Sequence, residues 1–158
     1  MRPINETPAD LARERAVADF LEARWRCQMV KLPPTSYPAD YGAYRAPERH
    51  IPGIRSTLCA IVEIKCRSRL IWPLMLSLQK ASRLSHYATT MNVPAFIVFA
   101  INGEVWSHQV SPPYPIGMGG REDRNQTGDM EPVILIETAD KIGVLCSTGV
   151  DKPVTVAR

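Results

Sequence analysis

A glutamate and a lysine interrupt an otherwise apolar run near the middle of the chain. Residues 58–67 begin as a β-rich segment without Gly or Pro, which is typical of a buried central strand. Within this segment Glu63 and Lys65 are two positions apart, so both side chains project from the same face of the strand. Charges at such a position are costly unless they pair with each other or bind something. The segment therefore predicts either an internal ion pair or part of a site.

A second carboxylate beside this pair would make a site for a divalent metal ion. Carboxylate oxygens bind Mg²⁺ or Mn²⁺, and such an ion polarises a phosphate oxygen and lowers the pKa of a bound water molecule. A neighbouring lysine can orient that water, accept its proton or offset charge on the phosphate. These are the requirements for hydrolysis of a phosphodiester. Taken alone, however, a Glu-x-Lys tripeptide is more often an ordinary ion pair that ends a strand.

Two other acidic residues are candidates for the second carboxylate. Glu14 falls between Leu11 and Ala18 on the apolar face of a predicted first helix, and no basic residue four positions on would neutralise it. It is either a small polar exception or part of a site. Asp40 lies within a predicted strand among aromatic residues, where aspartate is unfavourable. It either binds a metal or caps a turn that follows Pro38.

Basic residues outside these positions are candidates for contacts with a polyanion. Four are singled out: Arg67 after the central strand, Lys80 within a predicted second helix, and Arg121 and Arg124 in a long loop rich in Gly and Pro. Arginines in such a loop can bind phosphates. Lys80 either points over the site or is an ordinary surface lysine, and the sequence favours the surface position.

Two helices must position these residues. Thr7 can cap a helix and Pro8 suits its first turn, which predicts a helix from about residue 8 to residue 25. A second helix is expected over residues 72–91, because Asn92 can end it and Pro94 prevents its continuation.

Strands account for most of the remaining chain. They are expected over residues 26–32, 37–44, 58–67, 93–101, 104–110, 132–137 and 141–146. Asn102-Gly103 is a strong signal for a hairpin between two of them, and residues 111–129 are expected to be a polar loop. The pattern predicts an α/β fold with a central mixed β-sheet of about five strands flanked by helices.

The composition is that of one globular domain. The chain has 158 residues, of which 45% are hydrophobic and 22% charged, so we expect a single domain over residues 1–150 and a loose tail over 151–158. No apolar run approaches the ~20 residues of a membrane span, and no signal-peptide segment is apparent. These features, with four cysteines that lack C-x-x-C spacing, predict a cytoplasmic protein without membrane contact. The formal net charge of +3 permits a polyanionic partner without requiring one.

The order of these residues and elements resembles the PD-(D/E)XK nuclease superfamily. The resemblance rests on Glu14 in the first helix, on Asp40, and on Glu63-Ile64-Lys65 in the central strand. It implies a restriction-endonuclease-like αβββαβ core with a C-terminal β extension. It also implies that Asp40, Glu63 and the carbonyl of Ile64 bind Mg²⁺, with Mn²⁺ as a substitute. Lys65 would be the catalytic lysine, and Glu14 the first-helix glutamate of the resolvase-like and exonuclease-like branches.

The sequence departs from the family pattern in three places. Ala39 follows Pro38, where the family's proline normally precedes the aspartate directly, and residues 45–57 lengthen the gap between the two metal-binding carboxylates. The glutamine-tyrosine motif of the recombination-exonuclease branch is not clean after Gln79. The small size and the Gly-Gly-Arg loop look like those of phage-encoded members, for which the compartment would be the host cytoplasm.

The resemblance therefore implies a Mg²⁺-dependent deoxyribonuclease in which Glu14, Asp40, Glu63 and Lys65 form the catalytic site. Glu14 would complete a second metal site or orient a water molecule. Branched DNA is one expected substrate, and a homodimer is expected with it because two nicks in one junction need two sites. The alternative is a non-catalytic nucleic-acid-binding or assembly protein on the same fold. A third reading is an unrelated α/β domain in which Glu63 and Lys65 are a structural pair.

Overall fold

A mixed six-stranded sheet forms the centre of the molecule. The computed structural model describes residues 7–33, 37–47, 52–53, 55–119 and 130–145. The sheet has the strand order β1-β2-β3-β5-β6-β9, and a separate three-stranded sheet has the order β4-β8-β7. The helices are α1 (Pro8–Trp25) and α2 (Leu78–Met91); the strands are β1 (Gln28–Lys31), β2 (Tyr41–Arg45), β3 (Thr57–Arg67), β4 (Leu74–Ser77), β5 (Ala95–Ile101), β6 (Glu104–Gln109), β7 (Ile116–Gly119), β8 (Glu131–Ile136) and β9 (Asp140–Val144).

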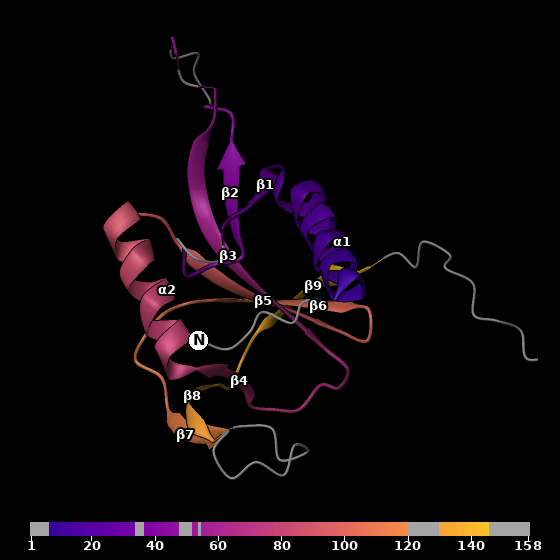
Figure 1. Ribbon diagram of the computed structural model, residues 1–158, viewed down its shortest axis with the longest axis vertical. Helices are drawn as coiled ribbons and strands as arrows, with labels where there is room; N and C mark the ends of the chain where they lie inside the picture. Colours follow the sequence, from indigo (N-terminus) through magenta and orange to yellow (C-terminus); the bar gives the residue numbers. More distant parts are fainter. Residues whose placement is uncertain (1–6, 34–36, 48–51, 54, 120–129, 146–158) are drawn as a thin grey trace, which may run out of the picture.

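The two helices lie on either side of the central sheet (Figure 1). Val17, Ala18 and Leu21 of α1 are buried against the β3 residues Val62 and Ile64. On the other face, α2 buries a separate apolar cluster that includes Leu84, Ile61 and Phe99. Because successive residues of a strand face opposite sides, Glu63 and Lys65 share the α2 face with Ile61. The predicted α/β architecture with a mixed sheet flanked by helices is confirmed, with six strands in the central sheet instead of about five.

The first helix begins and ends as its sequence predicts. Thr7 Oγ1 accepts a hydrogen bond from the backbone N–H of Asp10, and the Asp10 carboxylate accepts one in return from the Thr7 N–H. This reciprocal capping box satisfies two backbone donors that a helix start leaves unpaired. Arg26 ends the helix in the left-handed conformation.

The strands around the site differ from the prediction mainly at their ends. β2 begins at Tyr41, so Asp40 lies in the bend just before this strand and not inside it. β3 pairs with β2 in the antiparallel sense and with β5 in the parallel sense. The β5–β6 hairpin is confirmed, since Asn102 and Gly103 have φ values of 53° and 82°, as its tight turn requires.

The prediction that the second helix begins at residue 72 is wrong. Residues 74–77 form the strand β4, which pairs with β8, and α2 begins at Leu78. Leu74 and Leu76 are buried while Met75 is 41% exposed, which is the two-residue alternation of a strand. The apolar residues of this segment fit a helix pattern as well, and the partner strand that decides between them lies far along the chain.

The expected loop over residues 111–129 is also partly ordered into a strand. Its residues Ile116–Gly119 form β7, which pairs with β8 on the side opposite β4. Residues 120–129 lie outside the described part of the chain. Neither described helix has the length and apolar character needed to cross a membrane.

Candidate active site

Glu63 is a fully buried carboxylate with an ammonium group beside each of its oxygens. It lies in β3 opposite Ile97 of β5, and its side chain has no exposed surface. Oε1 is 2.6 Å from Lys65 Nζ, and Oε2 is 2.9 Å from Lys80 Nζ. The side chains of Lys65 and Lys80 are 33% and 31% exposed. Both lysines therefore extend from the molecular surface to one buried charge.

The electrostatics of this cluster follow from its burial. Burial raises the pKa of Glu63 most strongly; the Lys65 and Lys80 ammonium groups lower it, and the Asp40 carboxylate raises it further. Burial lowers the pKa of Lys65, but the Glu63 carboxylate outweighs this effect, so that the pKa of Lys65 is raised overall. Lys65 is thus a cation at neutral pH. Within the described residues, neither oxygen of Glu63 accepts a hydrogen bond of good geometry.

Asp40, just before β2, is hydrogen-bonded to β3, the strand that carries Glu63 and Lys65. Its Oδ2 accepts a hydrogen bond of 2.8 Å from the Ile64 N–H, and its own N–H donates to the Val62 carbonyl at 3.1 Å. The Asp40 carboxylate is tied to the backbone of β3, the strand that carries Glu63. The structure thus brings Asp40 beside Glu63, close enough for its charge to affect the pKa of the buried carboxyl.

Glu14 has a different partner. Its carboxylate forms an ion pair with Lys31 of β1, on the α1 side of the sheet. The side chain is 13% exposed, which agrees with the inward orientation predicted from the helix face. Burial, with the nearby Glu14 carboxylate as the next cause, raises the pKa of Tyr41 to about 12. Among the described residues, no three acidic, histidine or cysteine side chains lie close enough to hold one metal ion.

The sequence contains a weak signal for the partner of Glu14. Lys31 is two positions after Met29, a β1 residue that is buried with the α1 residues, so both side chains face the same way. A lysine in that register is directed towards α1. The sequence does not show how α1 is placed along β1. That placement decides that Glu14, and not another residue of α1, meets Lys31.

The four basic residues predicted to contact a polyanion lie in different surroundings in the structure. Lys80 does not take the surface position that the sequence favours, because its ammonium binds Glu63. Arg67 ends β3 and lines a hollow of about 350 Å³ under α1, together with Arg13 and Asn102. Arg121 and Arg124 lie outside the described residues.

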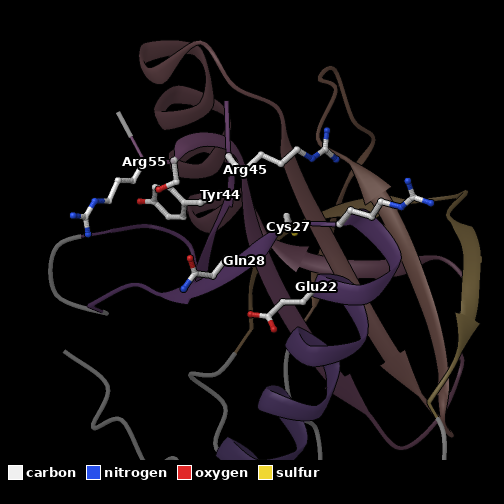
Figure 2. A pocket seen from close by; sticks show the side chains of 9 residues that line it. Glu22, Cys27, Gln28, Tyr44, Arg45 and Arg55 are labelled. Atoms are coloured by element: carbon white, nitrogen blue, oxygen red, sulfur yellow. The ribbon is translucent and has the colours of Figure 1, made fainter. Parts of the chain in front are cut away.

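A second hollow lies at the opposite end of β3, where the strand begins (Figure 2). It measures about 340 Å³, and its lining includes the guanidinium-bearing residues Arg26, Arg45 and Arg55. Arg45 donates a hydrogen bond of 2.8 Å to the Trp25 carbonyl, which anchors its guanidinium. The hollow is a basic surface feature remote from Glu63.

The fold, with Asp40 and Lys65 beside the buried Glu63, is that of the PD-(D/E)XK nuclease class. The chain belongs to the family described as "phage putative PDDEXK endonuclease", whose model matches residues 1–142. The family resemblance read from the sequence is therefore confirmed.

Other comparisons add little to this assignment. Among solved structures, the chain is similar to Hjc, a Holliday junction resolvase of Archaeoglobus fulgidus, with 17% identity and a TM-score of 0.43 over 77% of this chain and 82% of that chain. No curated protein matches the sequence at a significant level.

Proposed function

We propose that the chain is a divalent-metal-dependent endonuclease that hydrolyses phosphodiester bonds in DNA. The observation that carries the proposal is Glu63, a completely buried carboxylate next to Asp40 and 2.6 Å from the Lys65 ammonium. Membership of an endonuclease family supports the same reaction. A buried charge of this kind is costly to maintain, and such clusters are concentrated at functional sites.

The donor set fits Mg²⁺ or Mn²⁺. Each oxygen of Glu63 has only an ammonium group as its polar side-chain neighbour among the described residues, and the Ile64 N–H holds the Asp40 carboxylate in place at 2.8 Å. These are hard oxygen ligands of the type that both ions prefer. Asp40, Glu63 and the carbonyl oxygen of Ile64 would hold the ion, which when bound would polarise a phosphate oxygen and acidify a water molecule.

The side chains of the protein have separate tasks in this proposal. Lys65, whose ammonium is partly exposed beside Glu63, would position the attacking water and offset charge that develops on the phosphate. Arg67, Arg121 and Arg124 would contact phosphates of the substrate. Glu14 would serve a second ion or its water. It is paired with Lys31 on the α1 side of the sheet, whereas Glu63 and Lys65 are on the α2 face, so its carboxylate would have to leave that partner and reach the sheet edge.

A non-catalytic role on the same fold is the second candidate, and the ion pairs favour it. Glu63 already has two cationic neighbours, so the cluster could serve only to join β3 to α2. The protein would then bind or assemble on nucleic acid without cutting it.

The two candidates are separated by a cleavage assay. Labelled linear, nicked, flap and four-way DNA would be incubated with the protein in Mg²⁺, Mn²⁺ or Ca²⁺. We expect cleavage of at least one substrate in Mg²⁺ or Mn²⁺, and its loss in Glu63→Gln. Lys141→Met, which breaks only the exposed pair with Glu104, is the control and should cut normally. DNA binding without cleavage on every substrate would instead favour the non-catalytic role. Paired nicks on four-way DNA would support a homodimer.

A further inference from the structure

Lys80 is a second cation on Glu63 that the Glu-x-Lys motif does not explain. Lys65 comes from β3 itself, whereas Lys80 comes from the first turn of α2 and binds the other carboxylate oxygen at 2.9 Å. Its neighbour Ala81 is buried in the α2 face, so the backbone of this turn is fixed. The flexible stem of the lysine is 31% exposed and can still move between the buried carboxylate and the surface.

The charges in the cluster cannot all stay in place when a divalent ion arrives. Glu63 and Asp40 supply two negative charges, and the two ammonium groups already balance them. An ion with two further positive charges on the same oxygens would be repelled by both lysines at close range. One ammonium would therefore have to leave. Both lysines sit on fixed backbone and are similarly exposed, but the proposed function keeps Lys65 beside the ion, so Lys80 is the group that moves.

We propose that Lys80 is an internal counter-ion that occupies Glu63 while the site lacks metal, and that it exchanges Glu63 for a DNA phosphate when the metal binds. This inference rests on the proposed metal-dependent function. Under this exchange, metal binding and DNA binding favour each other. The metal releases the Lys80 ammonium from Glu63, and a DNA phosphate binds the released ammonium.

The first test is a calorimetric titration of Mn²⁺ into the DNA-free protein. Lys80→Met should bind Mn²⁺ at least about fivefold more tightly than the wild type, the lower end of a typical coupling between two ligands. Lys80→Arg, which keeps the charge, and Lys141→Met should bind as the wild type does. Equal or weaker binding by Lys80→Met would overturn the proposal. If that variant fails to fold, Lys80→Gln takes its place.

The second test is the salt dependence of binding to a fluorescent DNA duplex, measured with Ca²⁺ and without a divalent ion. In Ca²⁺ the log–log slope of Lys80→Met should be smaller in magnitude by about 0.9, the contribution of one phosphate contact. Without a divalent ion the slopes of variant and wild type should agree. The exchange would be contradicted if Lys80→Met lowered the magnitude of the slope equally with and without Ca²⁺. It would also be contradicted if the slope in Ca²⁺ did not change.

A Glu63→Gln titration separates this inference from the proposed function. If the wild type shows no Mn²⁺ binding that depends on Glu63, the metal-dependent function itself fails. If the wild type binds Mn²⁺ through Glu63 and Lys80→Met binds it equally well, only the role of Lys80 fails.

Discussion

Glu63 has an ammonium group beside each of its two oxygens. Removing one partner of a buried ion pair is strongly destabilising when it leaves a charge uncompensated. Lys80 lies 2.9 Å from the same carboxylate, so we expect Glu63 to keep a cationic partner when Lys65 is removed. The roles of Lys65 in catalysis and in stability can therefore be measured separately.

Lys65→Met should reduce cleavage by roughly 10²–10⁴-fold, the usual loss when a proton-transfer or charge-stabilising group is removed. Its circular dichroism spectrum should match that of the wild type, because Glu63 keeps one counter-ion. Cleavage rates and spectra would be recorded on the same preparations. Near-normal turnover would remove Lys65 from the catalytic site.

Asp40→Asn should separate metal binding from the local hydrogen bond. An asparagine side-chain oxygen can still accept from the Ile64 N–H, so stability without metal should change little. A ligand that binds only the native state stabilises it by about 2.7 kcal/mol at 100 times its Kd. Thermal denaturation with and without Mn²⁺ should show such an increase in the wild type, and a much smaller one in the variant. An equal increase in both proteins would mean that Asp40 does not bind the ion.

At the scale of secondary structure, α1 is held to the sheet edge through Glu14 and Lys31 and is held at its own start by Asp10. The side chain of Lys31 is 38% exposed, so solvent weakens this ion pair. An interaction of this exposure contributes about 1 kcal/mol or less.

Glu14→Gln should accordingly reduce the free energy of unfolding by no more than about 1 kcal/mol. A double-mutant cycle with Lys31→Met, followed by chemical denaturation, would measure the coupling between the two residues. Cleavage by the same variants tests the proposed metal role independently. A sharp loss of activity in Glu14→Gln, with Lys31→Met still active, would indicate that Glu14 leaves Lys31 during the reaction.

The capping box of α1 should make stability depend on acidic pH. Hydrogen bonds from Thr7 and Arg13 lower the pKa of Asp10 from 3.8 to about 2. A carboxyl group whose pKa is lower in the folded state contributes stability above its unfolded pKa and loses it as the pH falls towards the folded value. The difference in Tm between wild type and Asp10→Asn should thus be largest near pH 6 and shrink between pH 4 and pH 2. A difference that is constant with pH would show that the charge of Asp10 does not contribute.

Sequence patterns predicted helix ends and turns correctly where the contacts that stabilise them join residues close together in the chain. The Thr7–Asp10 cap and the Asn102-Gly103 turn lie within a few residues, and the alternation in β3 places Glu63 and Lys65 on one face. β4 was missed because its partner β8 comes more than fifty residues later. For Lys80 the sequence favours the surface over a position above the site, because a helical pattern does not reveal which residue lies above a particular carboxylate of the sheet.

At the scale of the whole molecule, the site is assembled from segments far apart in the chain. Asp40 comes from the bend before β2, Glu63 and Lys65 from β3, and Lys80 from α2. The family motif indicates the nuclease family and predicts Asp40, Glu63 and Lys65 as site residues. The charge balance at Glu63 becomes visible only in three dimensions.

The small sheet has a consequence for the order in which the protein is made. Ser77 ends β4 and directly precedes α2, and β8 both pairs with β4 and packs against α2. A ribosome that has released only the first 119 residues has therefore supplied every side chain of the Asp40–Glu63–Lys65–Lys80 cluster, but not the strand that anchors the helix carrying Lys80. The contacts of β8 with β4 and α2 can form only after translation has passed residue 136.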